Sequence, residues 1–159
     1  MNGKGYDINN NIVYELKNGN GYVKEYNDFT GKLMFEGEYI NGQRNGRSKA
    51  YYLNKKLNFE GEYFNDKRKG EGKEYNNKGQ LEFVGEYLYD YKLKGKYYIK
   101  NQLEYDGEYL YDKKWHGKGY DENGNVIYEL FNGNGRVKEY IIIVLKYFFI
   151  IWRRIFKWS

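Results

Sequence analysis

The sequence predicts an all-β chain, an elongated single-layer antiparallel β-meander built from repeated hairpins. Three observations support this prediction. A motif of aromatic, any residue, glycine, glutamate and aromatic returns about every two dozen residues; apolar and polar residues alternate within it; and glycine- and asparagine-rich turns separate the copies. A repeat of this length is typical of arrays in which each small unit packs only on its neighbours.

The motif occurs in four full copies: Phe35–Tyr39, Phe59–Tyr63, Phe83–Tyr87 and Tyr105–Tyr109. Two shortened copies, Tyr14–Leu16 and Tyr128–Leu130, occupy the same phase. Units therefore begin near residues 14, 35, 59, 83, 105 and 128. A longer period lies above this one, because residues 3–26 and 117–140 match at 18 of 24 positions. The chain therefore resembles a piece of a longer duplicated array.

Each unit is expected to form two short strands and two turns. The alternation has period two, so one face of the third copy receives Leu81, Phe83, Gly85 and Tyr87, and the other receives Glu82 and Glu86. Asn-Gly pairs such as Asn18-Gly19 and Asn132-Gly133 predict tight hairpin turns, since both residues tolerate positive φ. Successive units should continue one antiparallel meander.

The strand glycines predict close packing. Gly37, Gly61, Gly85 and Gly107 lie inside strands, where glycine is unfavourable unless another group approaches the backbone. The neighbouring residues are aromatic, so we expect a ring from an adjacent strand over each glycine. The rings would then form a stacked ladder along the array.

The motif, followed by a turn and Gly-x-Gly, resembles the MORN repeat (membrane occupation and recognition nexus) over about residues 3–140. The resemblance implies an elongated twisted sheet of hairpins without catalytic residues, serving as a scaffold, dimerisation module or membrane binder. Ser48 and Tyr97 are expected to replace second glycines of Gly-x-Gly turns. The residues of the repeat signature are Phe35, Gly37, Tyr39, Phe59, Gly61, Tyr63, Gly70, Gly72, Phe83, Gly85, Tyr87, Tyr105, Gly107, Tyr109, Gly117 and Gly119.

The composition argues against catalysis. Cysteine is absent, and the only hydroxyl residues of the serine and threonine type are Thr30, Ser48 and Ser159. The single histidine, His116, precedes Gly117 and is expected in a turn rather than in a metal site. Acidic pairs recur at corresponding positions of three units, as Glu36 and Glu38, Glu60 and Glu62, and Asp106 and Glu108. We therefore expect ion pairs with Lys73, Lys96 and Lys118 rather than one active site. We therefore predict no enzyme activity, no cofactor and no metal.

The net charge of +5 comes mostly from the last nineteen residues, 141–159, which hold four basic residues and no acidic one. The 27 basic residues less these four leave 23 against 22 acidic ones. An evenly mixed surface argues against a nucleic-acid partner. The start of the chain has no apolar segment typical of a signal peptide, and cysteine is absent, so a cytoplasmic or membrane-associated location is expected.

Residues 141–159 form a separate segment, rich in β-branched and aromatic residues. It is too short for a spanning helix and suits an interfacial membrane anchor, with candidate contacts Lys146, Trp152, Arg153, Arg154, Lys157 and Trp158. It also suits an aggregation-prone strand. A third hypothesis is a frame slip after Tyr140, because codons for residues 152–158, read one nucleotide later, can restore a Gly-Glu repeat motif.

The sequence thus divides into a repeat array, 1–140, and a hydrophobic, basic tail, 141–159. The predicted function is a non-catalytic scaffold or binding module that presents an extended β surface to a protein or membrane partner. Two alternatives stay open: attachment to a phosphoinositide-type membrane surface through the tail, and a regulatory fragment of a lipid-kinase-type enzyme. The oligomeric state is open as well.

Overall fold

The computed structural model describes residues 2–145 and 148–157, with side chains through residue 135. Every regular element in these ranges is a β-strand, so the predicted all-β meander is confirmed. The strands are β1 Gly3–Tyr6, β2 Ile12–Leu16, β3 Gly21–Tyr26, β4 Leu33–Ile40, β5 Gln43–Tyr51, β6 Leu57–Phe64, β7 Lys67–Tyr75, β8 Leu81–Leu88, β9 Tyr91–Ile99, β10 Gln102–Leu110, β11 Lys113–Tyr120, β12 Val126–Phe131, β13 Asn134–Leu145 and β14 Phe148–Lys157.

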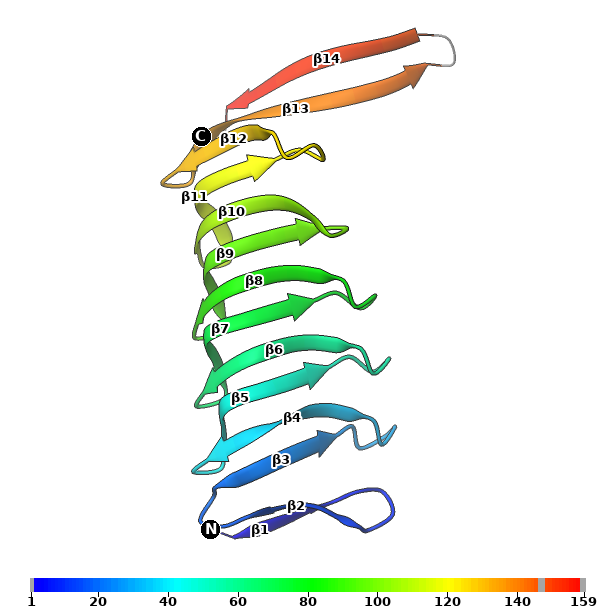
Figure 1. Ribbon diagram of the computed structural model, residues 1–159, viewed down its shortest axis with the longest axis vertical. Helices are drawn as coiled ribbons and strands as arrows, with labels where there is room; N and C mark the ends of the chain where they lie inside the picture. Colours follow the sequence, from blue (N-terminus) through cyan, green and yellow to red (C-terminus); the bar gives the residue numbers. More distant parts are fainter. Residues whose placement is uncertain (1, 146–147, 158–159) are drawn as a thin grey trace.

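Twelve of these strands form one antiparallel sheet. The strands β3 to β14 follow one another in chain order, so each lies between its predecessor and its successor. Figure 1 shows them as a single-layer stack that rises from the N-terminal end to the C-terminal end. The hairpin of β1 and β2 forms a separate two-stranded sheet, linked to β3 by the turn Asn18-Gly19 and one bridge between Lys17 and Asn20.

Two kinds of turn alternate along the stack. One side has two-residue turns with both residues at positive φ, such as Asn41-Gly42 (53° and 79°) and Tyr89-Asp90 (51° and 72°). The other side mostly has longer loops, such as the one closed by the hydrogen bond from the Asn76 amide to the Gln80 carbonyl, 2.9 Å. The turn Lys100-Asn101 replaces the longer loop in one unit, which explains its shorter sequence step.

A row of residues with little or no side chain crosses the middle of the sheet. The antiparallel register places these residues opposite one another from β4 to β11: Gly37, Ser48, Gly61, Gly72, Gly85, Gly95, Gly107 and Gly117. A Cβ atom on Gly85 would lie 2.6 Å from the Gly95 Cα atom and 2.9 Å from the Phe83 ring. The row therefore has no room for larger side chains.

Aromatic rings cover this row on one side, which we call the aromatic face. Phe59 lies over Gly61 of its own strand and over Gly72 of the next strand. Phe35, Phe59, Phe83 and Tyr105 are almost fully buried and alternate with Tyr63, Tyr87 and Tyr109. Neighbouring rings in this zigzag have centroids 5.3–5.5 Å apart and planes at 79–90°. The ladder is therefore edge-to-face, and the predicted stacked arrangement was wrong there; among the side chains that the structure describes, only Tyr105 and Tyr128 stack.

A basic side chain lies over the first ring of each full motif copy. Arg44 lies 4.2 Å from the centroid of Phe35, and Arg68 lies 4.3 Å from that of Phe59. Lys92 and Lys114 take the same place over Phe83 and Tyr105, at 5.2 and 5.0 Å. Such cation–π contacts contribute about 0.5–2 kcal/mol each, with the larger values where the cation is desolvated. They cover rings that a single-layer sheet would otherwise leave exposed.

Carboxylates hold these cations in place. Glu74 accepts hydrogen bonds across 3.0 Å from Arg68 and lies 2.7 Å from the Lys92 ammonium. Burial alone would raise the pKa of Glu74, but the hydrogen bonds and charges of Lys92 and Arg68 outweigh it and hold the pKa below its ordinary value. Glu25 pairs in the same way with Arg44 across 2.6 Å. Burial and the hydrogen bond to Glu25 raise the pKa of Tyr39 to about 12.

Two sequence predictions are corrected here. The Gly-x-Gly pairs lie inside strands β7 and β11, not in turns. The two pairs are offset relative to the glycine row: in β7 the second glycine, Gly72, lies in the row, whereas in β11 the first, Gly117, does, and Gly119 lies opposite Tyr105. Tyr97 also lies opposite Tyr105, so it takes the place of the second glycine as predicted, whereas Gly95 lies in the glycine row. His116 lies within β11, with its ring 4.9 Å from that of Phe131, because the turn ends before Lys113.

The predicted boundary after residue 140 falls inside one strand. The strand β13 continues from Asn134 to Leu145 and pairs with β14 in an unbroken register from Arg136–Lys157 to Leu145–Phe148. Figure 1 shows this hairpin, in orange and red, reaching further sideways than the others. Trp152, Arg153, Arg154 and Lys157 belong to β14, whereas Lys146 and Trp158 lie outside the described residues.

The glycine row predicts a strong response to one substitution. Gly85→Val would push a side chain against the Gly95 backbone and the Phe83 ring, so we expect a loss of about 1–3 kcal/mol of unfolding free energy, measured by thermal unfolding. Gly3→Val is the matched control, since no atom lies within 4 Å of its Cβ position. Equal melting temperatures for the two variants would contradict the close packing of the row.

The lowered pKa of Glu74 predicts a pH dependence of stability. The carboxylate stabilises the fold above its unfolded-state pKa, near 4.5, and this contribution disappears as the pH falls through the lower folded-state pKa. Glu74→Gln should therefore cost roughly 1–3 kcal/mol at neutral pH and much less near pH 3. Melting temperatures at both pH values test this, with Glu122→Gln, on an exposed loop, as control. If the difference in melting temperature between wild type and Glu74→Gln were as large near pH 3 as at neutral pH, the predicted pH dependence would be wrong.

Candidate functional site

The face opposite the aromatic face, here called the charged face, carries a cross-strand row of alternating charge. In register order from β3 to β12 the residues are Lys24, Glu36, Lys49, Glu60, Lys73, Val84, Lys96, Asp106, Lys118 and Glu129. Val84 alone interrupts the alternation in this row. The pattern arises because the same strand position is acidic in the first strand of a unit and basic in the second.

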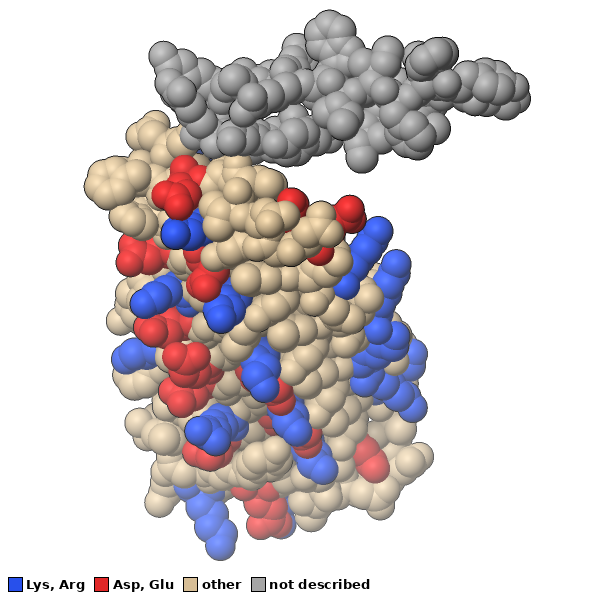
Figure 2. Space-filling model, turned by 45° about the horizontal axis from the view of Figure 1, so that its top comes forward, with Lys and Arg blue, Asp and Glu red and all other residues tan. Residues whose placement is uncertain are grey.

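The predicted ion pairs within this row are confirmed. The nitrogen–oxygen distance is 3.3 Å for Lys73–Glu60, 3.9 Å for Lys96–Asp106 and 3.3 Å for Lys118–Glu129. These side chains are substantially exposed, so each pair contributes only about 0.2–1 kcal/mol. Figure 2 shows acidic and basic side chains interleaved along the stack. The row therefore fixes register and solubility more than it adds stability.

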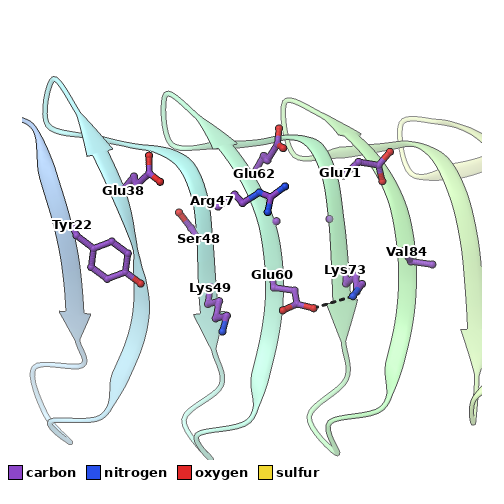
Figure 3. A pocket seen from close by; sticks show the side chains of 12 residues that line it. Tyr22, Glu38, Arg47, Ser48, Lys49, Glu60, Glu62, Glu71, Lys73 and Val84 are labelled. Atoms are coloured by element: carbon purple, nitrogen blue, oxygen red, sulfur yellow. Dashed lines mark ion pairs between the residues drawn. The ribbon is translucent and has the colours of Figure 1, made fainter.

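An open hollow of about 620 Å³ lies on the charged face between β3 and β8. Its lining includes four carboxylates, Glu38, Glu60, Glu62 and Glu71, and three cations, Arg47, Lys49 and Lys73. Figure 3 shows these side chains, with the ion pair of Glu60 and Lys73 drawn as a dashed line, and Gly61 and Gly72 also line the hollow. The hollow forms where the glycine row leaves the sheet thin.

One acid of the hollow, Glu60, is held ionised rather than poised for proton transfer. Tyr75 donates a hydrogen bond of 2.8 Å to Glu60, and Lys73 lies nearby, so the pKa of Glu60 is lowered. Burial and this hydrogen bond raise the pKa of Tyr75 to about 12. A carboxylate that stays charged accepts hydrogen bonds and pairs with cations, but it donates protons poorly. Glu60 therefore supplies negative charge and hydrogen-bond acceptors to the hollow rather than a proton.

A second feature of the charged face is a stripe of exposed apolar residues. Each even-numbered strand from β4 to β12 ends on an apolar residue, directly before a two-residue turn. We call these residues the apolar stripe: Ile40, Phe64, Leu88, Leu110 and Phe131. They are 41–66% exposed. Stripe residues are two strands apart, which places them about 10 Å from one another. Tyr91 and Tyr111 widen the stripe, with ring centroids 5.6 Å apart.

Neither the stripe nor the cations over the rings were predicted from the sequence. The pattern was present, because a basic residue follows the second motif aromatic by five positions in each full unit, as in Tyr63 and Arg68 or Tyr87 and Lys92. The apolar residue follows that same aromatic directly. The repeat-signature residues themselves lie in the glycine row and the ring ladder or beside them, and four of their rings lie directly under the cations.

The described residues contain no cluster of three or more histidine, cysteine, aspartate or glutamate side chains arranged for a metal ion. Among the same residues, no helix is long and apolar enough to cross a membrane. Ser48, in the glycine row, is buried, and its hydroxyl makes no hydrogen bond within the described residues. The arrangement on the charged face therefore offers polar and apolar contact surface over many strands.

Comparison with known proteins adds no closer identification. The sequence matches no family model and no curated protein. The repetition within the chain consequently provides the most direct comparison: β11 and β12 pair in the same register as β1 and β2, position by position from Gly117–Leu130 and Gly3–Leu16 onward. Surface features that return in every unit are the ones that a partner of the whole array can contact.

Proposed function

We propose that the chain is a non-catalytic scaffold of the MORN type, which binds an elongated protein partner along the apolar stripe of its charged face. The hairpin unit, the aromatic-Gly-Glu-aromatic motif and the ring ladder support the family assignment. The observation that carries the binding proposal is the return of an exposed apolar side chain at one position in five successive hairpins. Exposed apolar surface of this regularity is costly for a soluble protein unless a partner covers it.

The spacing of the stripe favours a helical partner. Apolar residues such as Phe64 and Leu88 are about 10 Å apart along the stack, which is close to the rise of seven residues in an α-helix. A helix with one apolar side chain per heptad could therefore contact successive units in the same way. The neighbouring carboxylates, such as Glu62 and Glu86, would pair with basic residues beside that apolar seam.

Photo-crosslinking tests this proposal. A benzoylphenylalanine in place of Phe64 or of Leu88, in the full chain expressed in its source cells, should attach to one and the same protein. The two attachment points, located by mass spectrometry, should lie about seven residues apart in that partner. Phe29 is the control position, because it is 94% exposed but lies on a loop at the other side of the stack. Equal crosslinking from Phe29, or none from the stripe, would refute the proposal.

A second candidate function is attachment to a membrane surface through the hairpin of β13 and β14. The register pairs the apolar run from residue 141 to 145 with the run from 148 to 152, and Arg153 and Arg154 follow directly. A hairpin that combines apolar and basic residues and reaches beyond the stack suits an anionic lipid surface.

Vesicle co-sedimentation tests this second candidate. The full chain should sediment with vesicles that contain phosphatidylserine and much less with neutral vesicles, because the basic residues supply the attraction. Arg153→Glu combined with Arg154→Glu should abolish the difference, and so should truncation after residue 140. Equal binding by the truncated and the full chain would show that the hairpin makes no contribution.

A further inference from the structure

The outer edge of β1 is an incomplete copy of a site that is filled elsewhere in the same chain. Among the described residues, β1 pairs only with β2. Its counterpart β11 pairs on both sides, with β12 in the register of β1 and β2, and with β10 on the other edge. The two copies share 18 of 24 residues, so the filled copy describes what the open edge can accept.

The strand β10 meets β11 with a defined set of residues. Tyr105 lies opposite Gly119, Asp106 opposite Lys118 and Gly107 opposite Gly117. In the first copy, the residues equivalent to these three positions of β11 are Gly5, Lys4 and Gly3. We propose that the outer edge of β1 binds an extended strand with an aromatic-acid-glycine sequence, supplied by a second repeat chain. Backbone hydrogen bonds along an open edge provide the affinity, and side chains at alternate positions provide the specificity.

The burial of equivalent residues supports this inference. Gly119 is buried, whereas Gly5 is only partly covered; Tyr120 is half-buried, whereas Tyr6 is 56% exposed. The ring of Tyr128 covers Gly119, and the ring of Tyr14 covers Gly5 in the same way. The first copy therefore has its own half of the site in place.

The filled copy also shows which contacts the occupant would add. Tyr128 stacks on Tyr105, with ring centroids 6.4 Å apart, and donates a hydrogen bond of 3.1 Å to Glu104. A docked strand with the sequence of β10 would bring both groups to Tyr14. The aromatic ring of the docked strand would stack on Tyr14. Its backbone would continue the hydrogen-bonded sheet beyond β1.

The occupant must carry one free edge. In a folded array β10 is paired on both sides, so an internal strand of a second copy cannot dock on β1. A terminal repeat strand, paired on one side only, meets the requirement. Binding of this kind joins arrays end to end in one continuous sheet. The inference rests on the repeat register alone and involves no residue of the apolar stripe, so its failure would leave the proposed function untouched.

A labelled peptide with the sequence of residues 102–110 provides the probe. Fluorescence anisotropy should show saturable binding to the full chain. A peptide with Gly107→Val should bind roughly tenfold more weakly or worse, because in the filled copy the Cβ position at Gly107 lies 2.6 Å from the Gly117 Cα atom. A peptide of the same composition in scrambled order controls for unspecific attraction to the tyrosine-rich surface.

The decisive variant is Gly3→Val in the protein. A Cβ atom at Gly3 meets nothing within 4 Å, so the fold should be unaffected, but at the equivalent Gly117 it would lie 2.6 Å from Gly107 and 2.8 Å from the Tyr105 hydroxyl. This variant should melt like the wild type and lose peptide binding. Undiminished binding by Gly3→Val, or no binding by the wild type at saturating peptide, would overturn the proposal. Hydrogen exchange should show added protection of those β1 amides that point away from β2, and only in the wild type with peptide.

Discussion

The fold depends on aromatic rings that lie flat against a row of glycines. A single-layer sheet has no second layer to bury its apolar side chains, so the chain must build cover from its own residues. Along one line from Gly37 to Gly117 every residue except Ser48 lacks a Cβ atom, which lets rings such as Phe59 and Phe83 lie directly on the backbone of two strands at once. Each ring then meets the next unit edge-on, and the geometry passes unchanged from one hairpin to the next.

The charged residues of the aromatic face complete this cover. Arg68 lies over Phe59, and Glu74 holds both Arg68 and Lys92. A planar guanidinium can lie over a ring and pair with a carboxylate at the same time, which serves here in place of a second sheet or a helix. Because these groups bury the central rings of one face, the other face does not have to be buried. That freedom is what allows a row of exposed charges and an apolar stripe to coexist on it.

Repetition gives the molecule its functional character. Most units present the same kinds of side chain at equivalent strand positions. The array therefore offers a row of regularly spaced contacts rather than one site. The edges are different, because a strand at the end of the stack has unpaired backbone groups whatever its side chains are. The faces of such a protein therefore suit long partners, and its ends suit strands.

The sequence by itself determined the strands, their alternation and the phase of the units, because a period of two within a period of about two dozen is a local property of the chain. It also determined the ion pairs of Lys73, Lys96 and Lys118, since acidic and basic residues recur at fixed strand positions. Only the tertiary structure decided the register. It places Gly117 rather than Gly119, and Gly95 rather than Tyr97, in the glycine row. Register depends on how many residues each turn and bulge takes up, as with Lys100-Asn101, and this number is set by pairing between strands rather than by spacing along the chain.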